Sequence, residues 1–255
     1  MLYSQQGYRV LLGLTTWWEK WKDRLYTNLI EDGRYKYLYK GLWMTMKITF
    51  FALLLGIALG VIAAIVRATH DKTIKDMRPG IKKFLLKFFN TIVNLYLTVI
   101  RGTPVVVQLM IMYYIIFAAS TNTLLVASLA FGINSGAYVA EIIRSGIMSI
   151  DNGQFEAGRS LGFNYVQTMI YIVIPQAFKN VLPALANEFI VLIKETSVSG
   201  YVGIMDLARG GDVIRSRTYD ALPGLIAVAI IYLIVVIFFT KLISILERRL
   251  RNSER

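Results

Sequence analysis

Long stretches of uncharged residues alternate with short charged segments along most of this chain. The residues Ile48–Val66 form one stretch of nineteen, and 221–240 form another of twenty. At a rise of about 1.5 Å per residue, either stretch can cross the ~30 Å hydrocarbon core of a bilayer as a helix. The pattern predicts an all-α integral membrane protein with apolar spans at about 45–66, 88–119, 123–147, 178–204 and 221–243. Residues 209–219, with their Gly210-Gly211 pair, are expected to form an external loop before the last span.

The second apolar span is interrupted by a polar tetrapeptide, Arg101–Pro104. Pro104 has no amide hydrogen and Gly102 weakens a helix, so backbone polar groups are freed at membrane depth. Irregular backbone persists there only where protein or a wet cavity supplies hydrogen-bond partners, and a buried arginine needs a partner or a pathway. The sequence therefore predicts a broken helix whose polar groups are satisfied by such partners.

Two features of the first span predict how it packs and which way it points. Gly56 and Gly60 form a small-xxx-small pair, which would let another helix approach closely. Residues 67–87 follow the span, carry seven Lys and Arg residues, and contain the helix-breaking pair Pro79-Gly80. A short loop this basic is expected in the cytoplasm by the positive-inside rule. The first span should therefore start outside and end inside.

Residues 151–175 form a polar island between the third and fourth spans, punctuated by helix-capping residues. Asp151, with a glutamine three positions later, has the spacing of a capping box, and Gly162 is suited to end a first short helix in a left-handed turn. Asn164 can cap a second short helix, which Pro175 is expected to close. The segment should therefore form two short helices joined by a tight glycine turn.

This island resembles the signature cytoplasmic loop of the permease subunits of ABC importers. The match rests on the spacing of Glu156-Ala157 and Gly162 and on the Ile172–Pro175 end, where an isoleucine replaces the usual leucine. Gly158 stands where an alanine is usual. In that family the loop docks in a cleft of a separate ATPase subunit, so residues 151–175 are named the docking loop. The resemblance assigns ATPase coupling to Asp151, Gly153, Gln154, Glu156, Ala157, Gly158, Ser160, Leu161, Gly162 and Pro175.

Three further stretches resemble the polar-amino-acid branch of the same family: RGTP with Gln108 beyond it, SGAYVAEIIRSGI and NEFIVLIKETS. Arg101 can then hold an anionic group such as an α-carboxylate, or it can pair with Glu141. Glu141 and Arg144 lie one helical turn apart, so a local ion pair is a competing role. Intramembrane polar residues suggest a substrate path. The residues predicted to line it are Arg101, Thr103, Gln108, Tyr138, Glu141, Asn187 and Glu188.

The N-terminal segment, residues 1–40, is predicted to be amphipathic and interfacial rather than a cleaved signal peptide. Its apolar run is short, and no small-residue cleavage site follows. Leu14, Trp18, Trp21 and Leu25 fall at helical spacing, with the charges largely on other faces. A helix of this kind is typical of the headgroup layer, and packing against the body of the protein is the alternative.

The resemblance implies the architecture of a whole transporter. Residues 41–250 are expected to form a five-helix transmembrane bundle of the ABC type I importer permease kind, in the cytoplasmic (plasma) membrane of a bacterium. The N-terminus should lie outside and the C-terminus in the cytoplasm. A second permease chain, identical or related, should complete the path. Two ATP-binding cassette subunits should bind the ATP and Mg, and an extracytoplasmic binding protein should deliver polar amino acids.

Composition bears on the alternatives. The chain is 56% hydrophobic, and its net charge of +12 reports membrane topology and lipid headgroups rather than nucleic acid. It has no cysteine, one histidine (His70) and no GxxxxGK[ST] motif. Thiolate metal sites, Ser/His/Asp or Cys/His catalysis and ATP binding through that motif are therefore not expected. We expect a non-catalytic subunit without its own cofactor or metal.

Three other functions stay open at this point. One is a permease for another small solute. A second is a passive channel using the polar interruptions, which the docking-loop pattern disfavours. The third is a membrane-embedded enzyme with Glu141 or Glu188 as acid or base, which the lack of a second catalytic group at suggestive spacing disfavours.

Overall fold

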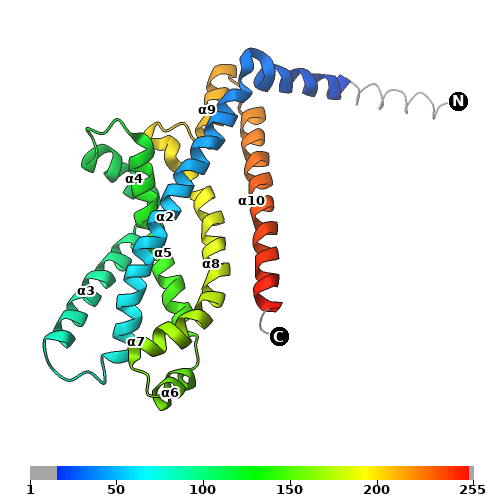
Figure 1. Ribbon diagram of the computed structural model, residues 1–255. Coiled ribbons are helices and arrows are strands. Elements are labelled where there is room, and N and C mark those ends of the chain that lie inside the picture. The colour runs from blue at the N-terminus through cyan, green and yellow to red at the C-terminus, as the bar shows by residue number, and fades with distance from the viewer. Residues whose placement is uncertain (1–15, 253–255) are drawn as a thin grey trace, which may run out of the picture.

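The computed structural model describes residues 16–252, and every regular element in that range is helical. After a helix at residues 16–25, the α-helices in chain order are α2 (Tyr35–Thr73), α3 (Ile81–Gly102), α4 (Val105–Ile111), α5 (Thr123–Met148), α6 (Asn152–Ser160), α7 (Tyr165–Thr168), α8 (Ile174–Glu195), α9 (Leu207–Thr218) and α10 (Ala221–Asn252). Within the described chain, five helical segments are long and apolar enough to cross a membrane: Tyr35–Thr73, Ile81–Gly102, Thr123–Met148, Tyr165–Val202 and Ala221–Arg248. The bundle is elongated, with α6 and α7 at one end and α9 at the other (Figure 1).

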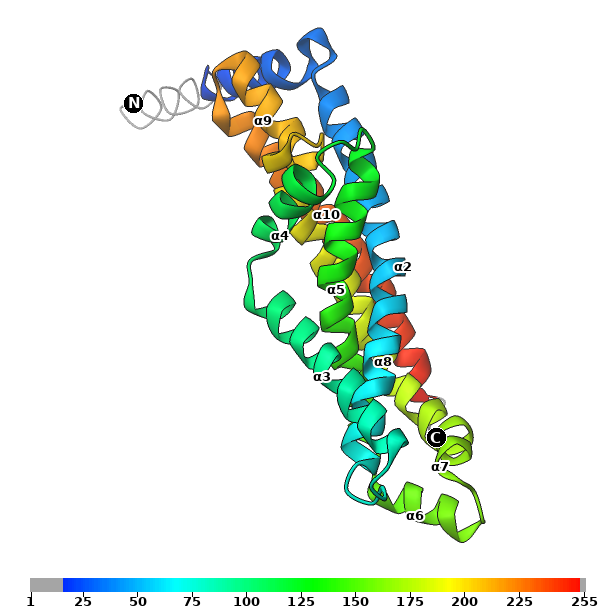
Figure 2. The ribbon, with the colours of Figure 1, turned by 90° about the vertical axis from the view of Figure 1, so that its left-hand side faces the viewer.

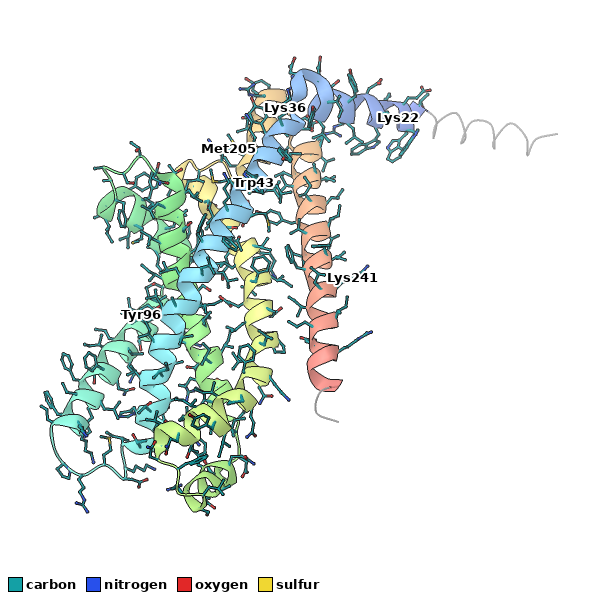
Figure 3. The ribbon with its side chains drawn as sticks, viewed as in Figure 1. Lys22, Lys36, Trp43, Tyr96, Met205 and Lys241 are labelled. Carbon is teal, nitrogen blue, oxygen red and sulfur yellow. The ribbon has the colours of Figure 1, made fainter. Side chains whose placement is uncertain are left out.

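Helices α2 and α5 pack side by side and form the centre of the bundle (Figure 2). A β-carbon on Gly60 would overlap Val139 of α5, and one on Gly56 would lie 3.1 Å from the side chain of Ser135. The predicted close approach is confirmed, with α5 as the partner, because only small residues let the two backbones meet. Helix α3 joins this pair through Tyr96 (Figure 3), whose hydroxyl donates to a backbone carbonyl of α5 at 2.6 Å.

The predicted break in the second span is confirmed. Helix α3 ends at Gly102, and α4 starts after Pro104. The Gln108 side-chain nitrogen donates to the carbonyl of Ile100 at 2.8 Å and to that of Thr103 at 3.1 Å. These two carbonyls lack their helical donors because the chain turns at the proline. Gln108 thus supplies from within the protein the partners that irregular backbone needs at membrane depth.

The expectation that Pro175 closes a helix is wrong. Helix α7 continues through a π-helical turn, Met169–Val173, directly into α8, and Pro175 occupies the first turn of α8. A proline fits a first turn, where its missing amide hydrogen is not required. The wider π turn before it lets the helix proceed without a break. The second helix of the docking loop and the fourth membrane span are therefore one continuous helix, which bends between α7 and α8 (Figure 1).

Residues 209–219, expected to be an external loop, are mostly helical and belong to α9. Asp206 caps the helix by accepting a hydrogen bond from the Arg209 amide at 2.8 Å. A β-carbon on Gly210 would lie 2.7 Å from a carbonyl oxygen of α2, and one on Gly211 would overlap a valine of α10. The two glycines serve close helix packing rather than a loop, because α9 is wedged between α2 and α10.

Residues 16–25 form a helix that crosses the end of the bundle beside the start of α10 (Figure 1). Two of its tryptophans are more than half exposed. Arg24 donates two hydrogen bonds to the carboxylate of Asp220, at 2.5 and 2.6 Å. The helix predicted for this part is confirmed, and an ion pair attaches it to the body of the protein. Leu14, the first member of the predicted apolar stripe, lies outside the described residues.

Candidate functional site

Helix α6 opens the docking loop. It begins at Asn152, after Asp151, whose side chain accepts a hydrogen bond from the Gly153 amide at 2.7 Å. The reciprocal cap expected between Asp151 and Gln154 does not form. Instead, the Gln154 side chain accepts a hydrogen bond from Gln176 at 3.1 Å, because the first turn of α8 lies close to α6 and offers that donor. The side chain therefore fixes α6 to the base of α8.

The turn after α6 is made by Gly162, with φ of +80°. This left-handed conformation disfavours any residue with a β-carbon. Asn164 then starts α7 with a complete capping box: its side chain accepts from the Gln167 amide at 3.0 Å, and the Gln167 side chain accepts from the Asn164 amide at 2.9 Å. The predicted pair of helices joined by a glycine turn is confirmed.

Buried contacts hold α6 against three other helices. Phe155 is 7% exposed and belongs to an apolar cluster with Ala68 of α2, Ile147 of α5 and residues at the start of α8. A β-carbon on Gly158 would lie 2.6 Å from the hydroxyl oxygen of Thr168. Glycine at this position, where the family usually has alanine, therefore fits the threonine opposite it. The loop is a packed element and not a free strand of chain.

The outward side of the docking loop is exposed at the far end of the bundle (Figures 1 and 2). Glu156, Ala157 and Ser160 are exposed, as is Leu161, whose side chain is 70% accessible. The arrangement presents an acid, small residues and one apolar side chain on a rigid support. These side chains can meet another protein without rearrangement of the loop.

A groove of about 490 Å³ lies between α3, α5 and α8, and it is named the polar groove here because Arg101, Glu141 and Glu188 line it. Four of the residues predicted for a substrate path line it: Arg101, Tyr138, Glu141 and Glu188. The Arg101 guanidinium lies over the Tyr138 ring, 5.7 Å from its centre. Cationic and anionic groups therefore face one open space within the membrane-spanning part.

Both acids of this polar groove are held by neighbouring side chains. The Glu141 carboxylate pairs with Arg144 at 2.6 Å, as the one-turn spacing predicted, and Arg144 also pairs with Asp71 of α2 at 3.2 Å. The Glu188 carboxylate accepts a hydrogen bond of 2.8 Å from Ser135. Arg101 is thus not the group that pairs with Glu141, and it keeps an exposed guanidinium beside Tyr138.

The remaining predicted path residues lie elsewhere. Thr103 and Gln108 belong to the helix break, where the Gln108 nitrogen bonds the Thr103 hydroxyl oxygen at 2.8 Å. Asn187 is exposed and is not among the residues that line the polar groove. Sequence reasoning missed Asn180, which lines the polar groove and donates to Ser149 at 3.3 Å. The signal was available, since Asn180 lies about two helical turns before Glu188 and on the same face.

Potential metal ligands do not gather in the part of the chain that the structure describes. Residues 16–252 contain no group of three or more His, Cys, Asp or Glu side chains that could hold a metal ion. The two acids of the polar groove, Glu141 and Glu188, take part in an ion pair and a hydrogen bond instead. An exposed guanidinium beside two carboxylates presents charges of both signs to the open space of the groove.

Comparisons with known proteins agree with these features. The arginine transport system permease protein ArtQ of Bacillus subtilis is 35% identical over 86% of this chain and 94% of its own length. A putative glutamine transport system permease protein GlnP of Rickettsia typhi is 33% identical over 84% of this chain and 93% of its own. A crystal structure of an amino acid ABC transporter with histidines has a chain of 40% identity and a TM-score of 0.72, covering 84% of this chain and 94% of that one.

Residues 81–252 match the family model for the inner membrane component of binding-protein-dependent transport systems. This range includes the docking loop, the broken span and all residues of the polar groove. The chain therefore belongs to this family, the membrane-spanning permease subunits of ABC importers.

Proposed function

We propose that this chain is the permease subunit of an ATP-driven importer for polar amino acids, and that ATPase subunits dock on its docking loop. The observation that carries the proposal is a rigid, exposed docking loop continuous with a membrane span. Two ATP-binding cassette subunits would bind ATP and Mg. A second permease chain, identical or related, would complete the path, and an extracytoplasmic binding protein would deliver the substrate.

The chemistry of the polar groove supports an amino acid as the solute. Arg101 can attract an α-carboxylate, while Glu188 can attract an α-ammonium group. Relatives are named for arginine, glutamine and cystine transport. We favour a neutral polar amino acid over a cationic one, because Glu141 is already neutralised by Arg144 and the groove holds no third acid.

The proposed orientation places the docking loop and the C-terminus in the bacterial cytoplasm and the N-terminus outside. Support comes from the seven Lys and Arg residues in 67–87, beside the same end of the bundle as the docking loop. The helix at 16–25 would then lie at the outer membrane surface, where its exposed tryptophans fit the headgroup layer.

The proposed mechanism is mechanical. Closure of two ATPases around ATP would bring two docking loops together, and each loop would carry the movement into its own bundle. The continuous helix of α7 and α8 provides one route, since no break separates them. The apolar cluster around Phe155 provides contacts to α2 and α5. Rocking of packed bundles would then open the path to alternate sides of the membrane.

Transport measured in reconstituted vesicles tests this function. The permease is reconstituted with the binding protein and with the ATPase encoded by a neighbouring gene. Uptake of glutamine, cystine, arginine and glutamate is then compared with and without ATP. ATP-dependent uptake of at least one is expected. Uptake that is indifferent to ATP would indicate a channel, and uptake of arginine alone would reject the preference for a neutral substrate.

A second experiment tests docking. Glu156→Ala and Gly162→Ala are combined, and membrane retention of the ATPase and its hydrolysis are measured. Both are expected to fall, because the pair changes the exposed face and the turn that sets its shape. Asp212→Ala, at the opposite end of the bundle, is the matched control. Unchanged retention and hydrolysis in the double variant would reject the docking role.

A further inference from the structure

Lys72, at the cytoplasmic end of α2, contacts the docking loop in two ways. Its ammonium nitrogen donates a hydrogen bond to the side-chain oxygen of Asn152, the first residue of α6, at 2.8 Å. The same nitrogen lies 4.5 Å from the centre of the Phe155 ring. The two contacts together restrict where the ammonium group can lie, because each favours its own geometry.

The space around this contact makes Lys72 important for the position of α6. A cavity of about 400 Å³ separates the end of α2 from the docking loop, and Lys72, Asn152 and Phe155 all line it. Phe155 and Ala68 of α2 belong to one apolar cluster, which is the other link nearby. Apolar packing is non-directional, whereas the Lys72 hydrogen bond adds a directional contact between α2 and α6. When Lys72 is present, a displacement of α6 should therefore produce a larger displacement of α2.

The residue beside Lys72 extends the connection to the polar groove. Asp71 pairs with Arg144 of α5 at 3.2 Å, and Arg144 pairs with Glu141 at 2.6 Å. Glu141 lines the polar groove. Consecutive residues at the end of α2 thus face in two directions, Lys72 toward the docking loop and Asp71 toward α5. The ion pairs and the close α2–α5 packing join the loop to the groove by an unbroken series of contacts.

We propose that Lys72 is a positioning residue that ties the docking loop to the α2–α5 pair, so that movement of the loop is transmitted to the polar groove. This inference rests on the proposed function, in which the loop is driven by an ATPase. It adds a polar contact to the apolar contacts with α2 and to the direct route through α8. Without Lys72, the docking loop still moves α8 but moves α2 less. Fewer substrate molecules are then transported for each ATP hydrolysed.

The first test measures substrate molecules transported per ATP hydrolysed in the reconstituted transporter. Lys72→Met should lower this ratio by about five-fold or more, and Lys72→Arg, which keeps the charge and a donor, should restore most of it. Lys75→Met removes an exposed positive charge one turn away and is the matched control, expected to leave the ratio unchanged. An unchanged ratio in Lys72→Met, or an equal fall in Lys75→Met, would overturn the proposal.

The second test does not depend on the ATPase or the substrate. Because the chain has no cysteine, Ile65→Cys on α2 and Ser160→Cys on α6 give a unique pair for spin labels in the full-length permease in lipid bilayers. Lys72→Met should broaden the measured distance distribution, and Lys72→Arg should not. A distribution unchanged by Lys72→Met contradicts the positioning role. If the wild-type transporter shows no ATP-driven uptake, the proposed function fails, while this distance measurement still decides the role of Lys72.

Discussion

Ser135 of α5 donates a hydrogen bond of 2.8 Å to the carboxylate of Glu188 on α8, and both side chains are buried. The bond joins the fourth span to the central α2–α5 pair at the point where Gly56 lets α2 approach Ser135. A buried carboxylate is costly without a donor. The contact therefore holds Glu188 in place in the polar groove and sets the spacing between α5 and α8.

Removal of that donor should destabilise the protein. Ser135→Ala leaves Glu188 buried without its partner and is expected to lower the free energy of unfolding by about 1–3 kcal/mol. The measurement is thermal unfolding of the purified permease in detergent. Ser128→Ala is the control, since Ser128 is buried on the same helix and its hydroxyl has no hydrogen-bond partner among residues 16–252. Equal losses in the two variants would count against this interpretation.

The pairing of Gly158 with Thr168 predicts a specific rescue. Gly158→Ala introduces a β-carbon 2.6 Å from the Thr168 hydroxyl oxygen and should cost about 1–3 kcal/mol through overpacking in the docking loop. Membranes that carry Gly158→Ala should therefore retain less ATPase than wild-type membranes, because the docking loop is distorted. Thr168→Ala removes the obstructing atoms, so the double variant should recover retention. Thr168→Ala alone should have little effect, and failure of the double variant to recover would show that the clash is not the cause.

The left-handed turn at Gly162 should tolerate few substitutions. Gly162→Ala is expected to cost about 1–2 kcal/mol, because a β-carbon is unfavourable at φ of +80°. Gly162→Asn should cost less, since asparagine adopts this conformation more readily. Protease susceptibility of the docking loop reports the change. Gly80→Ala serves as the comparison, as its β-carbon would meet nothing within 4 Å. Similar susceptibility in all three variants would argue against a conformational requirement.

Asp206 predicts how stability depends on pH. Burial raises the pKa of this carboxyl, which lies outside the membrane spans, to about 7. The Asp206 carboxyl ionises at a lower pH in the unfolded chain than in the folded one. The stability that its neutral form gives to the fold is therefore complete below about pH 4 and is lost as the pH rises through about 7. The loss should be on the order of a few kcal/mol. Asp206→Asn keeps an oxygen that can cap α9 and should remove this dependence.

The measurement is the unfolding temperature of wild type and Asp206→Asn from pH 5 to 8. This window avoids the titration of Asp212 and Asp220, whose pKa values lie below the usual range because of hydrogen bonds from Arg215 and Arg24 respectively. Ionised Asp212 and Asp220 stabilise the fold above their unfolded pKa. Their contribution to stability therefore rises with pH, in the opposite direction to that of Asp206, and it does so below this window. Parallel curves for wild type and variant would contradict the assignment to Asp206.

The sequence by itself determined the class of fold, the spans and the docking loop. Uncharged stretches of nineteen and twenty residues have few alternatives to membrane-spanning helices, because unpaired backbone groups are too costly in lipid. Gly162 and Asn164 specify local backbone geometry through their own side chains, or the lack of one, so their roles were readable without tertiary contacts. The same holds for the break at Pro104.

Only the tertiary structure decided how these elements meet. The glycines of α9 suggested a loop, because a glycine pair looks the same in sequence whether it bends the chain or admits a neighbouring helix. Pro175 suggested a helix end, because a preceding π turn leaves no local signal. The partners of Gln154, Arg101 and Lys72 come from elements distant in the chain, and no spacing rule specifies a contact of that kind.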